Sequence, residues 1–127
     1  MSTVLDRARR EYLEQQVASA PPERLVTMLY DRLLVDVERA AAAHTASDHP
    51  AASAALTHAQ AIIAELHGSL DDRWDGAPDL RALYTYLTGR LIVANVAHDP
   101  AAIDECRALI APLREAWHAA AAAVAQS

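Results

Sequence analysis

The fold of this chain is decided by one stretch, in which residues 79–95 read DLRALYTYLTGRLIVAN. Apolar side chains recur there at steps of three and four residues, at Leu80, Leu83, Leu87, Leu91 and Ala94. This spacing is typical of a helix that buries one face against other helices. Tyr84 and Tyr86 are two residues apart, so on a helix they point about 200° away from each other. One tyrosine can therefore lie in the core while the other faces outward.

The composition of the chain favours an all-α protein. Of its 127 residues 53% are hydrophobic, and there are only three glycines and no phenylalanine. This length is enough to bury a core, so we expect a single domain spanning residues 1–127. The one cysteine, Cys106, cannot form an internal disulfide and falls on an apolar stripe, which predicts a core residue.

Charge and hydropathy exclude several classes of partner. The net charge is −6, and this acidic balance leaves no basic face for nucleic acid. All eleven basic residues are arginine. Residues 1–10 lack the apolar segment of a signal peptide, and the longest apolar run, residues 119–125, is too short and too weakly hydrophobic to span a bilayer. We therefore expect a cytoplasmic, cytosolic protein with no nucleic-acid partner and no membrane insertion.

Working outward from residues 79–95, the apolar pattern predicts four long helices and a short N-terminal helical arm in residues 1–20. The helices are expected at residues 22–44, 50–72, 78–97 and 100–124. Asp48 and Asp99 each stand just before a helix with a proline in its first turn, which is the pattern of an N-cap. Because the connections are short, neighbouring helices must run antiparallel, and the prediction is an antiparallel up-down four-helix bundle.

Two details of this bundle call for an explanation. Gly89 lies inside the third long helix, where glycine costs about 1 kcal/mol relative to alanine. Close approach of another backbone would explain it. The arm of residues 1–20 is too short to be a stable helix by itself, so it must dock on the bundle or stay mobile. Its apolar side, which includes Leu5 and Tyr12, favours docking.

The chain carries little that points to catalysis. A di-iron carboxylate bundle needs two Glu-x-x-His motifs, and only Glu115 with His118 has this spacing. A histidine phosphotransfer domain needs an exposed helical histidine, usually with a lysine nearby; His58 and His67 are candidates, but there is no lysine. No glycine-rich phosphate loop and no Cys–His pair is present. We therefore expect no enzyme activity, no metal site and no cofactor.

The apolar stripes of helices 22–44 and 50–72 are broader than a tight bundle seam uses. An exposed apolar groove on a small protein usually binds another molecule. The natural partner would be an amphipathic helix or a segment that folds on binding. An ordinary core with a few leucines on the surface is the alternative that the pattern leaves open.

Several segments in consistent order carry a more specific pattern. They read PERLVTMLYD at 22–31, AQAIIAEL at 59–66, SLD at 69–71, LYTYL at 83–87, RL at 90–91, AN at 94–95 and LREAW at 113–117. Together they resemble the flagellin export chaperone family, FliS, and Tyr12 and Val17 fit the N-terminal tyrosine and valine of that family. The chain departs from the family pattern at Pro21, where a serine cap is usual, and at Thr85, where an aspartate is usual.

The resemblance implies a cytoplasmic chaperone that binds the disordered C-terminal segment of flagellin, prevents its premature polymerisation and assists its delivery to the flagellar type III export gate. It also implies that the arm, through Tyr12 and Val17, is a movable cover over the client groove. We expect the client to contact the outer apolar edges of three helices, at Leu29, Leu33, Ile62, Leu66, Tyr84 and Tyr86. The protein would be a monomer or a homodimer.

Two other functions remain open on the sequence alone. The chain could be a generic helical adaptor whose partner is not flagellin. It could also be a four-helix regulatory domain of the phosphotransfer type, which the histidines discussed above would serve.

Overall fold

The computed structural model describes residues 4, 7, 23–73 and 75–126 of the chain. Within these residues the helices are α2 (Glu23–Thr45), α3 (His49–Gly68), α4 (Ala77–Ala97) and α5 (Pro100–Ala125). Their ends lie within one residue of the bounds predicted from the sequence, except at the end of α3. The predicted arm of residues 1–20 lies outside the described residues apart from Val4 and Arg7. The predictions for Tyr12 and Val17 therefore also concern residues outside the described part of the chain.

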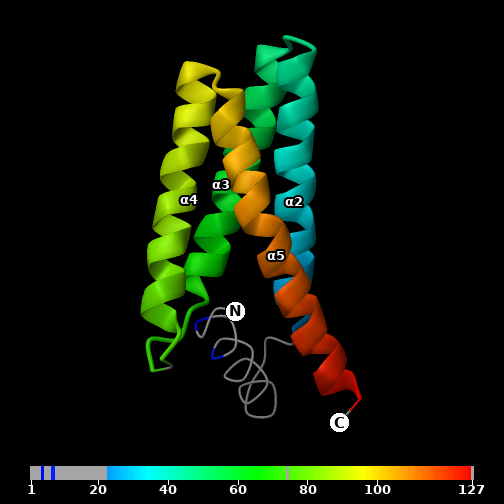
Figure 1. Cartoon of the computed structure of the whole chain (residues 1–127), viewed down its shortest axis with the longest axis vertical. Helices are drawn as coiled ribbons and strands as arrows, with labels where there is room; N and C mark the ends of the chain where they lie inside the picture. The colour runs from blue at the N-terminus through cyan, green and yellow to red at the C-terminus, as the bar shows by residue number, and fades with distance from the viewer. Residues whose placement is uncertain (1–3, 5–6, 8–22, 74, 127) are drawn as a thin grey trace.

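The four helices form an antiparallel up-down bundle (Figure 1). Helices α2 and α4 each pack against both α3 and α5, so α2 and α4 occupy opposite corners. The α2–α3 connection is residues 46–48 and the α4–α5 connection is residues 98–99, and Figure 1 shows both at the same end of the bundle. Such short connections leave no room for a parallel neighbour. The all-α bundle predicted from the sequence is confirmed.

Side-chain caps start two of the helices where the sequence placed them. The Asp48 carboxylate accepts a hydrogen bond from the Ala51 backbone N–H at 3.1 Å, and Asp99 accepts one from the Ala101 N–H at 3.0 Å. Both of these helices, α3 and α5, carry a proline in the first turn. Backbone N–H groups in a first turn have no hydrogen-bond acceptor within the helix, so the N–H that proline lacks costs nothing there. The two predicted N-caps are therefore confirmed.

Helix α3 ends at Gly68, four residues before the predicted end at residue 72. The Asp71 carboxylate accepts a hydrogen bond from the Arg73 backbone N–H at 2.9 Å, which holds the chain in a turn. Leu70 continues the apolar spacing and packs against the core without being helical. The apolar pattern therefore continues beyond Gly68, where the hydrogen-bonded helix ends.

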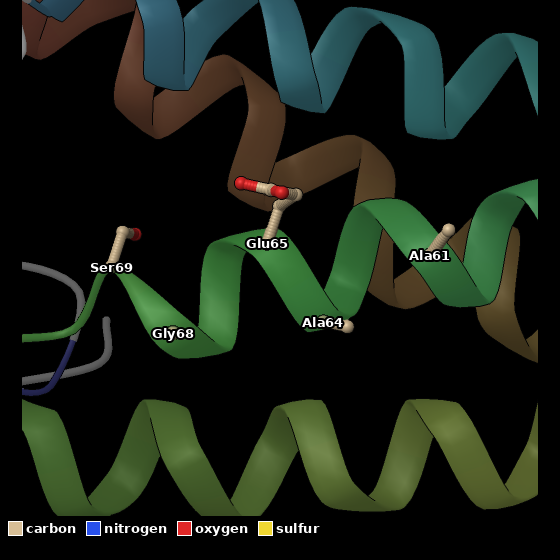
Figure 2. Close-up of a pocket in the computed structure, with 5 residues that line it drawn as sticks. All are labelled: Ala61, Ala64, Glu65, Gly68 and Ser69. Carbon is tan, nitrogen blue, oxygen red and sulfur yellow. The ribbon is translucent and has the colours of Figure 1, made fainter.

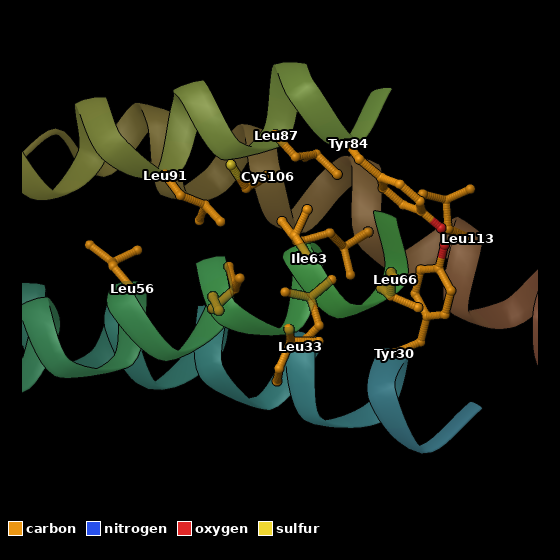
Figure 3. Close-up of a cluster of buried hydrophobic side chains, with 14 of the residues drawn as sticks. Tyr30, Leu33, Leu56, Ile63, Leu66, Tyr84, Leu87, Leu91, Cys106 and Leu113 are labelled. Carbon is orange, nitrogen blue, oxygen red and sulfur yellow. Dashed lines mark hydrogen bonds between the residues drawn. The ribbon is translucent and has the colours of Figure 1, made fainter. Parts of the chain in front are cut away.

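The core lies along the axis of the bundle, where the inward stripes of the four helices meet (Figure 3). Every helix supplies fully buried side chains, among them Leu33, Val37, Leu56, Ile63, Leu87, Leu91, Ile103 and Ile110. Cys106 is also fully buried, as predicted, and burial raises the pKa of its thiol to about 11. The inward face of each helix is thus occupied, and what remains for binding lies on the outside.

Candidate protein-binding surface

Four of the six side chains that the sequence suggested as client contacts lie inside the bundle. Leu33, Ile62, Leu66 and Tyr84 are each no more than 6% exposed. Figure 3 shows Leu33, Leu66 and Tyr84 among the packed core side chains. Leu29 is partly buried and packs against the same core, so Tyr86 is the member of the set with a largely open side chain. A partner could reach the four buried residues only if the bundle opened.

Tyr84 is held in the core by a partner that sequence reasoning did not identify. Its hydroxyl shares a hydrogen bond with the hydroxyl of Tyr30 at 2.5 Å, and the ring of Tyr30 stacks on Trp117 with centroids 6.3 Å apart. Burial raises the pKa of Tyr84 to about 12 and that of Tyr30 well above its usual range. Both hydroxyls are therefore neutral over the physiological pH range, and this buried polar pair joins α2 to α4.

The outward side of α4 carries an uncharged surface that we call the α4 outer face. Its members are the exposed residues Ala82, Thr85, Tyr86, Gly89, Ile92, Val93 and Val96. At 100° per residue they span about 120° of the helix surface, opposite the buried stripe. Val96 is 78% exposed, Tyr86 47% and Ile92 45%. A cluster of apolar side chains left this open is a candidate site of interaction.

Gly89 lies at the centre of the α4 outer face. A methyl group added there would meet no atom within 4 Å. The close approach of another backbone, which the sequence suggested as the reason for this glycine, is therefore not made by any described part of this chain. The room above Gly89 is open to a partner.

Tyr86 is anchored at the edge of this face by α5. Its hydroxyl donates a hydrogen bond to the Glu105 carboxylate, which also accepts one from the Arg90 guanidinium at 2.8 Å. The hydrogen bond from Tyr86, together with that from Arg90, lowers the pKa of Glu105, and the same bond raises the pKa of Tyr86. The polar end of Tyr86 is thus satisfied, while the ring stays exposed beside Val93.

The exposed apolar residues of α2 do not form a comparable surface. Leu25, Met28 and Val35 are 45%, 58% and 38% exposed, respectively. Three arginines, Arg24, Arg32 and Arg39, lie on the same side of the helix between them. A partner covering them would have to desolvate or pair those guanidinium groups. Scattered apolar side chains among charges are ordinary for a protein surface. The α4 outer face is therefore the better candidate for a docking site.

Helix α3 adds a shallow hollow of about 400 Å³ on its own outward side (Figure 2). It is lined by Ala61, Ala64, Glu65, Gly68 and Ser69, which all come from the end of α3 and its C-cap. Because most of these side chains are small, a partner's backbone could approach α3 closely here.

Comparison with known proteins agrees with the pattern read from the sequence. The model of the family described as flagellar protein FliS matches residues 5–124 of the chain. The chain belongs to the FliS family. Proteins named flagellar secretion chaperone FliS are 34% identical to it over 108 residues in Escherichia coli and 36% over 108 residues in Salmonella typhimurium. The Bacillus subtilis protein of that name is 31% identical over 106 residues. These alignments cover 83–84% of this chain and 79–80% of each relative.

FliS is a family of chaperones rather than of enzymes, and two of the histidines considered for other chemistry, His58 and His118, are bonded to aspartate carboxylates in this member, while the ring of His67 lies beside that of Tyr84 with centroids 6.0 Å apart. His58 bonds the buried carboxylate of Asp36, which also accepts a hydrogen bond from Arg32 at 3.0 Å. His118 bonds Asp31 at 2.7 Å. These contacts tie α2 to α3 and to α5, which is a structural role.

Two further observations apply to the residues that the structure describes. No three His, Cys, Asp or Glu side chains among them are arranged to hold a metal ion. In the same part of the chain, none of the helices combines the length and the hydropathy that crossing a membrane requires.

The residues of the α4 outer face that sequence reasoning missed are Ile92, Val93 and Val96. A signal for them was present in the sequence, because they are large apolar residues that fall off the buried stripe of their helix. In this FliS family member they would have been found by asking which apolar residues the stripe leaves unexplained.

Proposed function

We propose that this protein is a flagellar secretion chaperone that binds the disordered C-terminal segment of flagellin, prevents its premature polymerisation and assists its delivery to the flagellar type III export apparatus. The proposed partners are flagellin and the export gate, and the proposed action is binding in the cytosol without catalysis. The observation that carries the proposal is the α4 outer face, an uncharged apolar surface on a chain whose relatives are named flagellar secretion chaperones.

The client would fold as it binds, laying the apolar side of an amphipathic helix on the α4 outer face. The exposed parts of Tyr86, Ile92, Val93 and Val96 amount to roughly two whole side chains. Covering them is worth about 3–6 kcal/mol, at about 1.5–3 kcal/mol for each fully buried side chain. Ordering a disordered segment costs about 2–5 kcal/mol.

These two free energies are of similar size, so contacts on α4 alone would only offset the cost of ordering the client. Tight binding would need a client that extends over a neighbouring helix as well. The hollow on α3 is a neighbouring surface that would admit a second close contact, because α3 packs beside α4 and the side chains that line the hollow are mostly small. We therefore propose a client that crosses both α3 and α4.

We also propose that the N-terminal arm, through Tyr12 and Val17, is a movable cover of the client site. Val4, a described residue of the arm, is partly buried and lines an apolar hollow of about 260 Å³ between α4 and α5, beside Leu83 and Pro112. A short arm can be displaced at low cost. Tyr12→Ala should therefore bind the client more tightly than the native chain, and unchanged affinity would argue against a cover.

The main test is calorimetric titration of the purified protein with the C-terminal segment of flagellin from the same organism. The expected result is one-to-one binding with a large negative heat-capacity change and a gain of helix by the peptide. Val93→Asp should weaken binding about 10- to 100-fold, because a carboxylate would be buried without a partner.

The matched control is Val35→Asp, which makes the same change at the same 38% exposure but on α2. It should leave the affinity within about twofold of the native value, since the effects of distant surface substitutions are small. Equal losses in both variants would contradict the placement of the site on α4. No binding of flagellin by the folded protein would favour a helical adaptor with another partner.

A further inference from the structure

Three histidines from three different helices meet at one end of the bundle. His44 is in the last turn of α2, His49 is the first residue of α3, and His98 is the C-cap of α4. The ring centroids of His49 and His98 are 4.0 Å apart, and those of His44 and His49 are 6.5 Å apart. This is the end at which the α2–α3 and α4–α5 connections lie side by side (Figure 1).

These imidazoles differ from other histidines of the chain in what holds them. His58 and His118 are each fixed by an aspartate carboxylate. Among the described residues, no hydrogen bond occupies a ring nitrogen of His44, His49 or His98. His49 and His98 are also solvent-exposed, so their rings can turn without disturbing the core. They are available as ligands.

The spacing of His49 and His98 is close to that of two histidines on one metal ion. An ion bonded to imidazole nitrogens at about 2.0–2.1 Å holds two such rings with their centroids about 4.5–5 Å apart. The observed 4.0 Å needs only a small rotation of exposed side chains. Imidazole is a preferred ligand of Zn²⁺, Cu²⁺ and Ni²⁺.

We propose that His49 and His98 form a two-histidine site for a divalent transition-metal ion of the zinc and nickel class. The remaining positions on the ion would be filled by water. The nearby carboxylates of Asp48 and Asp99 are already engaged as helix N-caps, and the Cys106 thiol is buried in the core. The bound ion would link the α2–α3 connection to the α4–α5 connection.

The test is calorimetric titration of the full untagged chain with ZnCl₂ or NiCl₂ alone. We expect one ion per chain with micromolar affinity, and a melting temperature that rises with metal concentration because the ion binds only the folded state. His49→Ala and His98→Ala should each weaken binding about tenfold or more. His44→Ala should have a smaller effect, because the centroid of its ring lies 6.5 Å from that of His49.

The matched control is His67→Ala, which removes a histidine near the opposite end of the same helix, α3. His67→Ala should leave metal binding unchanged. Circular dichroism should show that this variant and the three alanine variants of His44, His49 and His98 are folded. Millimolar binding by the native chain would overturn the proposal, as would equal losses in His67→Ala and His49→Ala. Retention of full affinity in the double variant of His49 and His98 would also overturn it. The proposal is independent of client binding.

Discussion

Replacing Gly89 by alanine should stabilise the bundle. Glycine inside a helix destabilises it by about 0.5–1 kcal/mol relative to alanine, because its backbone loses more freedom on folding. Gly89 lies well inside the 21 residues of α4, and the added methyl group would meet no atom within 4 Å. No steric cost opposes the gain. The expected rise in the free energy of unfolding is therefore about 0.5–1 kcal/mol, or about 2–5 °C in melting temperature.

The assay is urea unfolding followed by circular dichroism at the helix band, with the native chain and the variant measured side by side. Gly68→Ala is the natural control, because that glycine also has open space around it but is the last residue of α3, where helices fray. Its gain should be smaller. A Gly89→Ala variant that is equally stable or less stable would refute the reasoning, since it would mean that another part of the chain closely approaches α4.

The same variant also tests how the client binds. If a client backbone passes close to Gly89, the alanine methyl group should weaken flagellin binding even though the bundle itself is more stable. Unchanged affinity would place the client elsewhere on the α4 outer face. Opposite signs for stability and affinity would be difficult to explain by a general effect on folding.

Three further predictions concern the core and the helix–helix ion pairs. Tyr84→Phe should lower the free energy of unfolding by about 1–3 kcal/mol, because it leaves the hydroxyl of Tyr30 buried without this partner. Denaturant unfolding measures this loss. The double variant, with Phe at both Tyr30 and Tyr84, should lose less stability than the sum of the losses in the two single variants. With its pKa raised to about 11 by burial, Cys106 should be about one part in a thousand thiolate at pH 8, so thiol reagents should label it only as the protein unfolds; rapid labelling of the folded chain would contradict this. Partial burial raises the pKa of Asp31, but hydrogen bonds from His118 and Arg114 outweigh it and hold that pKa below its ordinary value of 3.8. The stabilisation from Asp31 should therefore be present above about pH 4 and lost as the pH falls through the lowered pKa, so the difference in melting temperature between the native chain and Asp31→Asn should shrink in acid.

Much of the fold follows from the sequence because helices are set by local interactions. The apolar stripes at steps of three and four residues placed the four helices, and the N-caps at Asp48 and Asp99 placed two of their starts. The end of α3 was misplaced because Leu70 continues the apolar pattern after the backbone has left the helix. Periodicity reports which side chains are buried, and a residue in a turn can be buried as well as one in a helix.

The sequence by itself determined that Tyr84 and Tyr86 point to opposite sides of one helix, and that a helix carrying them packs in a bundle of the FliS family. Only the tertiary structure decided that Tyr84 is the inner residue, bonded to Tyr30 from α2, and that Tyr86 faces outward beside α5. Helix geometry fixes the relative directions of side chains along one helix. Which of those directions a neighbouring helix covers depends on contacts between residues far apart in the chain, and local patterns do not contain them.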